Sequence, residues 1–138
     1  MNSQLKKASI ERYSRQIVLK DIGTIGQKKI ISSKVLIVGM GGLGSPVAEF
    51  LARAGVGSIG IVDDDKVELG NLSRQTLFNL SDIGKLKVTQ AKSKIKKIYK
   101  NIKINIFKEK LLKNNIKKIL KNYEIICDGT DNFEARYL

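Results

Sequence analysis

VLIVGMGGLGSPVAEFLARAGVGSIGIVDDD, residues 35–65, is the stretch that decides the fold of this chain. Its first part, residues 35–38, is a short apolar run rich in β-branched residues, which is typical of a buried strand. Ser45 and Pro46 suit the first turn of a helix. A second apolar run, residues 59–62, leads into three aspartates. The stretch therefore predicts a strand, a glycine turn, a helix and a second strand parallel to the first.

The glycine turn has the composition of a nucleotide site. Gly39, Gly41 and Gly44 fit the spacing G-x-G-x-x-G, with Gly42 as an extra glycine. Glycines let the backbone approach phosphate groups closely, and the following helix offers unpaired N–H groups at its first turn. A carboxylate after the second strand, from the tip Asp63–Asp65, can bind ribose hydroxyls. The usual ligand of this motif is a nicotinamide or flavin dinucleotide, so the turn alone leaves the nucleotide open.

The length of the chain and its composition limit the possible classes. Its 138 residues suit one domain, 1–138, with a helical segment at about residues 4–31 before a core that starts near residue 34. No apolar run approaches the roughly 18 residues of a membrane span, and the N-terminus lacks a secretory signal, so we expect a cytoplasmic protein with no membrane partner. A single cysteine excludes an intramolecular disulfide and a Cys₄ zinc site on this chain.

The net charge of +13 raises the question of nucleic acid. The basic residues are spread over the whole length, and no aromatic RNA-binding strand or Cys/His finger occurs, so we expect no nucleic-acid partner. Only five of the 26 cationic residues are arginine, and each arginine therefore hints that a planar fork of donors is needed. Arg12 and Arg15 lie three apart on one helix face, where the residues alone favour a solvated surface.

Periodicity predicts the remaining elements and hence the fold class. The chain is expected to form an α/β, Rossmann-like, doubly wound and mostly parallel sheet of about four strands in the order 3-2-1-4. Its helices are predicted at residues 4–19, 27–31, 46–54, 84–100, 114–121 and from Phe133, and its strands at 35–38, 59–62, 103–108 and 123–127.

Packing roles follow from the same periodicity. In the helix at 46–54, the apolar residues Val47, Phe50, Leu51 and Ala54 are predicted to share one face. Cys127 in the last strand is predicted to be a buried structural thiol.

Polar side chains are expected to gather where the strands of this sheet end. Asn71, Arg74, Lys87 and Asp131 all fall near that edge. A dinucleotide needs little beyond backbone donors and a ribose carboxylate, whereas two cations and a carboxylate able to hold Mg²⁺ suit a triphosphate being cleaved. The chain has no histidine, so histidine-based catalysis is not available to it.

One reaction fits this set of side chains. A carboxylate that attacks the α-phosphate of ATP is already ionised and needs no general base, so fixed charges and positioning do the catalysis. The sequence thus favours an adenylation site, with a nicotinamide-dependent oxidoreductase as an alternative.

Five motifs carry a resemblance to a known family. They are RYSRQI (12–17), GMGGLGSPVAEFLARAGVG (39–57), the D-x-D tip with V-x-L-x-NLSRQ (63–75), DIGKLKV (82–88) and DGTDN (128–132). In this order and spacing the chain resembles the ThiF/MoeB/HesA family, bacterial relatives of ubiquitin-activating enzymes. The resemblance implies an enzyme that uses ATP and magnesium to adenylate the C-terminal glycine of a ubiquitin-like sulfur-carrier protein. It implies release of pyrophosphate, a role in thiamine or molybdopterin synthesis, and a homodimer.

The resemblance also implies roles for single residues. Gly42 would lie against the phosphates, Asp63 would hold the ribose, and Asp131 would bind magnesium. Arg15 would reach into the ATP site of a partner subunit, which reverses its interpretation as a solvated residue. Asn71, Arg74 and Lys87 would bind the triphosphate, with Gln75 in support. The nucleotide-binding candidates are Gly39, Gly41, Gly42, Gly44, Asp63, Asp65, Asn71, Arg74, Gln75, Lys87, Asp131 and Asn132, and the catalytic candidates are Arg74, Lys87, Asp131 and Arg15.

The chain departs from the family after its last predicted strand. Family members continue into a region with further strands, the carrier-binding groove and usually two C-x-x-C zinc pairs, none of which occurs in these residues. We therefore expect a truncated or N-terminal portion. The alternative function is a non-catalytic nucleotide-binding half that needs a complementary chain. The motifs do not separate the thiamine branch from the molybdopterin branch.

Overall fold

The computed structural model of the chain describes residues 5–131 and Tyr137. Its strands form one sheet in the order β3-β2-β1-β4, and all three pairings are parallel. In the central pairings Val38 lies opposite Val62 on one side and Asp128 on the other. The predicted fold class and strand order are therefore confirmed. The strands are β1 (Lys34–Val38), β2 (Ser58–Val62), β3 (Lys103–Phe107) and β4 (Ile125–Asp128).

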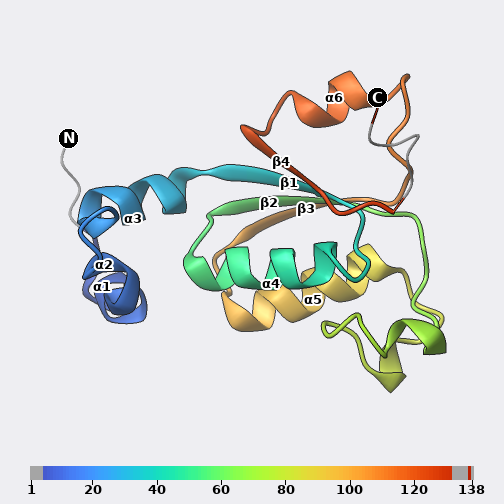
Figure 1. Ribbon diagram of the computed structural model, residues 1–138, viewed down its shortest axis with the longest axis horizontal. Coiled ribbons are helices and arrows are strands. Elements are labelled where there is room, and N and C mark those ends of the chain that lie inside the picture. Colours follow the sequence, from blue (N-terminus) through green and yellow to red (C-terminus); the bar gives the residue numbers. More distant parts are fainter. Residues whose placement is uncertain (1–4, 132–136, 138) are drawn as a thin grey trace.

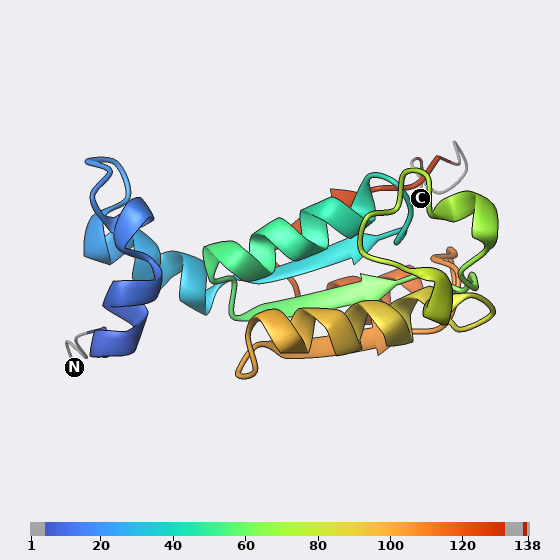
Figure 2. The same ribbon diagram turned by 90° about the horizontal axis from the view of Figure 1, so that it is seen from below.

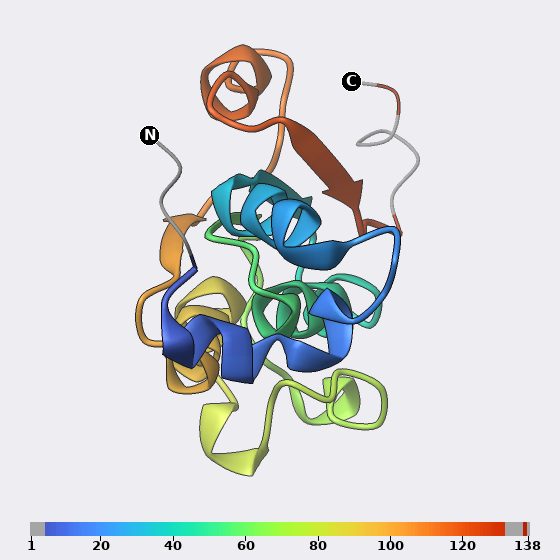
Figure 3. The same ribbon diagram turned by 90° about the vertical axis from the view of Figure 1, so that its left-hand side faces the viewer.

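Helices cover the two faces of the sheet unequally (Figure 1, Figure 3). The long helices α4 (Gly44–Ala54) and α5 (Lys87–Ile98) lie on one face, and the short α6 (Ile116–Leu120) lies on the other. Beyond one end of the sheet is the N-terminal arm, formed by α1 (Lys7–Arg12), α2 (Ser14–Ile17) and α3 (Gly23–Ser32). The crossing loop, residues 66–86, joins β2 to α5 and contains the 3₁₀ turns η1 (Leu69–Asn71) and η2 (Leu80–Asp82).

The main core lies between the sheet and the helices α4 and α5. Ile37, Ile59 and Ile61 have no exposed surface, and neither do the α4 residues Ala48 and Ala52 that pack against them. Small residues on this face of α4 let the helix approach the sheet closely. Phe50, from the apolar face predicted for this helix, does not pack inward, because its side chain is 68% exposed. Spacing alone gave the direction of the apolar face but did not show that alanines occupy its centre.

Several predicted boundaries shift because tertiary contacts override local spacing. The helix predicted for residues 4–19 is interrupted at Tyr13, which is 2% exposed and packs its ring against Gly55. The helix predicted for 27–31 is longer and begins at Gly23. Cys127 is only half-buried, because β4 is an edge strand, so the prediction of a buried thiol is wrong. The helix predicted from Phe133 lies outside the described residues.

The N-terminal arm is fastened to the last turns of the two long helices. Arg12 Nη2 donates a hydrogen bond to the carbonyl oxygen of Ile98 at 2.9 Å, and its guanidinium lies 4.8 Å from the centre of the Tyr99 ring. Gln27 Nε2 donates to the carbonyl oxygen of Ala54, also at 2.9 Å. The last carbonyl groups of a helix lack partners within the helix, so these side chains complete them. The arm therefore sits at the end of α4 and α5 that is remote from the glycine turn (Figure 2).

Candidate nucleotide-binding site

A cleft of about 830 Å³ lies at the carboxyl edge of the sheet. This volume is within the range of small-ligand sites, and the carboxyl edge is where open α/β sheets bind ligands. Ten of the twelve predicted nucleotide-binding residues line it: Gly39, Gly41, Gly42, Asp63, Asp65, Asn71, Arg74, Gln75, Lys87 and Asp131. Of the other two, Gly44 does not line the cleft and Asn132 lies outside the described residues. The catalytic candidate Arg15 does not line the cleft either.

The glycine turn is held by contacts that leave no room for side chains behind it. Gly39 has a φ of +88°, a conformation that glycine adopts at little cost. A Cβ atom on Gly44 would collide with the carbonyl oxygen of Gly39, so Gly44 lies buried under the turn and allows helix and strand to pack. Gly42 differs, because a Cβ there would meet only the side chain of Arg74, at 3.6 Å. A Cβ on Gly41 would likewise meet only Gln75 Nε2, at 3.7 Å, so Gly41 and Gly42 are both glycines that leave room toward the cleft.

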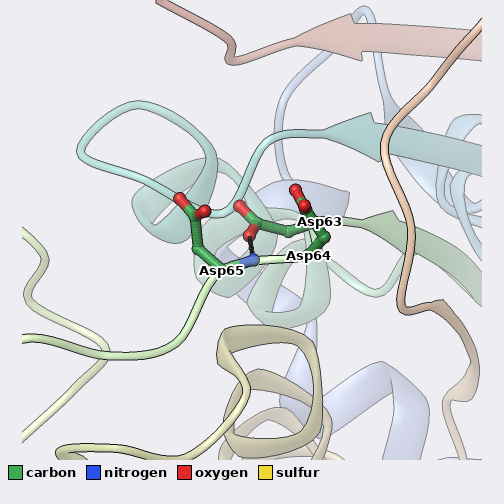
Figure 4. Close-up of side chains that lie close together, drawn as sticks. All are labelled: Asp63, Asp64 and Asp65. Atoms are coloured by element: carbon green, nitrogen blue, oxygen red, sulfur yellow. Dashed lines mark hydrogen bonds between the residues drawn. The ribbon is translucent and has the colours of Figure 1, made fainter.

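Asp63 connects the end of β2 to the glycine turn. Its Oδ2 accepts a hydrogen bond from the backbone N–H of Met40 at 2.6 Å, and its Oδ1 accepts one from the backbone N–H of Asp65 at 2.7 Å (Figure 4). Burial raises the pKa of Asp63 above its usual range, and the two backbone hydrogen bonds oppose that rise. Each carboxylate oxygen keeps a free lone pair. The group can therefore hold the turn in place and still accept hydrogen bonds from two hydroxyls.

Lys87 is a buried cation at the back of the cleft. The crossing loop folds back so that the N–H of Lys87 donates to the carbonyl oxygen of Asp65 at 2.9 Å. This pairing starts α5 at Lys87 and brings Lys87 Nζ to 3.0 Å from Asp65 Oδ2. The lysine side chain is 7% exposed and the aspartate 64%. Since a buried ammonium needs an anionic partner, a phosphate entering the cleft can take the place of the exposed Asp65 carboxylate.

One turn of the crossing loop supplies three further polar side chains. Asn71 ends η1, and its carbonyl oxygen accepts the N–H of Gln75 at 2.8 Å, which holds the turn together. Arg74 Nη1 donates to the carbonyl oxygen of Gly70 at 3.2 Å, and its stem lies over Gly42. Gln75 is 2% exposed, and its Oε1 has no hydrogen-bond partner among the described residues. The turn therefore presents an exposed guanidinium above the glycines and a buried amide beside them.

Asp131 lines the cleft from the opposite side, after β4. The turn before it is closed by Asp128, whose Oδ1 accepts hydrogen bonds from Thr130 N and Thr130 Oγ1 at 2.9 and 2.6 Å. Asp131 itself is exposed. A carboxylate thus lies in the same cleft as the cations Arg74 and Lys87, as the strand order predicted.

The sequence interpretation missed one part of the cleft, the segment 109–112 after β3. The N–H of Asp63 donates to the carbonyl oxygen of Phe107 at 3.2 Å, which keeps the end of β3 beside the end of β2. Lys110 adds a further cation to the cleft wall, and Leu111 adds an apolar surface. The strand order 3-2-1-4 was the signal that could have found this segment, because it places the end of the third strand at the same edge.

An ion pair anchors the crossing loop to α5. Asp82 Oδ2 lies 2.6 Å from Lys94 Nζ and 2.8 Å from the N–H of Asn79, and the Asp82 side chain is 5% exposed. Burial raises the pKa of Asp82, but the hydrogen bonds and charge of Lys94 and Asn79 outweigh it, and the net pKa is lowered. The ionised form is thus preferred in the folded protein.

Asp82→Asn is expected to lower the free energy of unfolding at neutral pH by about 3 kcal/mol, because it leaves Lys94 half-buried without its partner. Since the folded pKa is the lower one, the stabilisation exists above the unfolded pKa of about 3.9 and is lost as pH falls through the folded value. Urea unfolding should show that the free energies of unfolding of the wild type and of Asp82→Asn differ at pH 7 and become similar at pH 3. Asp64→Asn, at an exposed carboxylate, is the control. An equal difference in the free energy of unfolding at both pH values would contradict the assignment of this stabilisation to the ionised Asp82 carboxylate.

Comparison with known proteins identifies the family. The model of the ThiF family matches residues 13–138. The chain belongs to the ThiF family. A probable molybdopterin-synthase adenylyltransferase of Gracilaria tenuistipitata var. liui is 42% identical over 99% of the chain, and the chain covers 39% of that protein. A sulfur carrier protein adenylyltransferase of Thermus thermophilus is 37% identical over 96% of the chain, with 49% of that protein covered. The ThiF-family chain thus spans less than half the length of these two relatives.

Solved structures agree on the fold. E. coli tRNA N6-threonylcarbamoyladenosine dehydratase, TcdA, in complex with ATP, superposes with a TM-score of 0.82 at 22% identity, over 94% of this chain and 53% of that one. At that identity the likeness concerns the Rossmann-like fold, of which this ThiF-family chain holds four strands. In the part of the chain that the structure describes, no helix is long and apolar enough to cross a membrane.

Proposed function

We propose that this ThiF-family chain provides the ATP site for adenylating the C-terminal glycine carboxylate of a ubiquitin-like sulfur-carrier protein, with release of pyrophosphate. The observation that carries the proposal is the shared cleft. It unites the glycine turn and Asp63 with the two cations Arg74 and Lys87 and with the carboxylate of Asp131. The relatives that carry adenylyltransferase names agree with this chemistry. Thiamine and molybdopterin synthesis are the two candidate pathways.

The charges in the cleft suit an attack by one anion on another. The carrier carboxylate would attack the α-phosphate of ATP, a new C–O–P linkage would form, and the bond to pyrophosphate would break. Arg74 lies over the glycine turn and Lys87 lines the same cleft beside Asp65, so both can neutralise charge on the phosphate chain and on the leaving group. The nucleophile is ionised at neutral pH, so the chain needs no histidine to remove a proton.

Magnesium fits the donor set of this cleft. Mg²⁺ is commonly held by one or two carboxylates together with substrate phosphates and water. Asp131 is an exposed carboxylate in the cleft wall and is the residue that would hold the ion. Bound there, the ion would neutralise charge on the triphosphate.

The proposed function includes a homodimer, because Arg15 cannot serve its own cleft. Arg15 is exposed and lies in α2, three residues beyond Arg12, which contacts the last turn of α5. The cleft begins at Lys87, the first residue of that helix. At 1.5 Å per residue these two ends of α5 are roughly 16 Å apart. An arginine at this position can act only on the site of a second subunit.

ATP–pyrophosphate exchange tests the proposed function. The purified chain is mixed with candidate carriers, ATP, Mg²⁺ and labelled pyrophosphate, and label should enter ATP only when a carrier is present. Gly42→Ala is the discriminating variant. Its Cβ meets only ordinary van der Waals distances in the protein, so the fold should survive, while a phosphate against the turn should be excluded. Exchange that persists in this variant would refute the assigned phosphate position, and calorimetric binding of NAD without ATP would favour the oxidoreductase.

A second candidate is a nucleotide-binding half that acts only with a complementary polypeptide. The observation that favours it is the state of β4, an edge strand in which Ile125 is 52% exposed and Ile126 48%. These residues face opposite sides of the sheet, and strands of parallel sheets are normally covered on both faces. If the purified chain alone carries out carrier-dependent exchange, this candidate is excluded.

A further inference from the structure

A second groove, of about 630 Å³, lies at the arm end of the molecule, between α1, α3 and the turn from α5 to β3. We propose that it binds a phosphate-bearing anion at a site separate from the nucleotide cleft. The two sites lie at opposite ends of α5. Lys87 at its first residue borders the cleft, and Tyr99, directly after its last residue, lines the groove. Within one subunit, the groove is therefore not an extension of the proposed ATP site.

The groove is lined by cations without counter-ions. Lys6, Arg12 and Lys28 come from α1, the residue before it, and α3, and the described residues of the lining include no carboxylate. Within the described part of the chain, none of the three takes part in an ion pair. Two lysines with little exposed surface elsewhere do form ion pairs, Lys87 with Asp65 and Lys94 with Asp82. Three cations that line one groove and form no ion pair among the described residues favour an anionic ligand.

The Arg12 side chain is already held in place at the groove. Its guanidinium is held by the Ile98 carbonyl oxygen at 2.9 Å and by the Tyr99 ring at 4.8 Å, so little side-chain entropy remains to be lost on binding. A guanidinium is planar and presents paired donors that match two phosphate oxygens. The chain uses lysine for most of its cations. An arginine at this place therefore agrees with recognition of a forked, tetrahedral anion.

Neutral groups complete the site. The Ser9 hydroxyl and the Asn101 amide line the groove and can donate hydrogen bonds. Ile31 adds an apolar wall that suits the organic part of a phosphorylated molecule. The lining thus accommodates inorganic phosphates and phosphorylated organic molecules by the same chemistry.

Backbone amide NMR of the whole chain tests this proposal, with inorganic pyrophosphate as the probe, at constant ionic strength and without magnesium. We expect saturable shifts at Ser9 and Asn101, which report the groove. Shifts at Gly41 and Gly42 report the cleft separately, so failure of the proposed ATP site does not affect the result. A second titration with a phosphorylated sugar distinguishes inorganic from organic ligands. Shifts confined to the cleft would refute the groove site.

The double variant Lys6→Gln, Lys28→Gln is expected to weaken pyrophosphate binding in the groove about tenfold, because two charge-assisted contacts are lost. Lys29→Gln is the matched control, since Lys29 is the exposed neighbour on the same helix and does not line the groove. It should change the affinity less than twofold. Equal losses of pyrophosphate affinity in the double variant and in Lys29→Gln would show that general positive charge, and not the groove, binds pyrophosphate. Tighter binding of a tetraglutamate peptide than of pyrophosphate would refute the assignment to phosphate.

Discussion

Arg74→Ala is expected to reduce carrier-dependent ATP–pyrophosphate exchange at least about a hundredfold, the loss typical when a fixed charge that stabilises the transition state is removed. Arg74 is exposed, and its side chain donates a hydrogen bond to the neighbouring loop carbonyl of Gly70, so its removal should cost little stability. Its stem rests over Gly42, where the phosphates are proposed to lie. Loss of activity in a protein of unchanged melting temperature would therefore report lost electrostatics and positioning.

Two further variants define the requirement at this position. Arg74→Lys keeps the charge but loses the planar fork, so it should recover only a small part of the exchange. Arg53→Ala is the matched control, because Arg53 is an exposed arginine on α4 whose partner is Glu49, outside the cleft. Wild-type exchange in Arg74→Ala would exclude this residue from the reaction, and a parallel loss in Arg53→Ala would indicate a nonspecific effect of charge.

The fold could be predicted from the sequence where pattern and packing agree. The runs at 35–38 and 59–62 could only be buried strands, and the G-x-G-x-x-G turn between them fixed a parallel unit, so the strand order followed. The arm was harder to predict. The N-terminal helix is interrupted at Tyr13, whose buried ring packs on Gly55, and nothing near Tyr13 in the sequence indicates that contact. Contacts between distant residues decide such breaks, and a single sequence does not contain them.

The candidate site was also predictable only in part. Motif spacing brought Asp63, Arg74 and Asp131 to one edge, because the ends of parallel strands meet there. The pairing of Lys87 with Asp65 was not predictable, since it depends on the crossing loop folding back on itself. Gly44 lies behind the turn instead of in the cleft, and only the position of the Gly39 carbonyl group shows why. Spacing therefore identifies the edge of the sheet, and packing assigns each residue its place there.

Arg15→Ala is expected to reduce exchange as severely as Arg74→Ala, although α2, which contains Arg15, belongs to the N-terminal arm at the far end of the subunit (Figure 2). Its neighbour Arg12 is tied to the last turn of α5, while the cleft opens at the first. No side chain spans that length, so a catalytic Arg15 must come from a partner subunit. Lys20→Ala, at an exposed cation after α2, is the control and should leave exchange unchanged.

Mixing the two inactive proteins decides whether the contribution crosses subunits. If Arg15→Ala and Arg74→Ala subunits are unfolded together and refolded as an equal mixture, half of the dimers will be mixed, and each of these will hold one site with both arginines. Such a mixture should recover about a quarter of wild-type exchange in a closed two-fold dimer. Sedimentation of each pure variant must show that it still associates. A mixture that stays inactive although both variants dimerise would refute a contribution of Arg15 to the partner's site, since complementation of this kind is possible only when each site takes its two arginines from different chains.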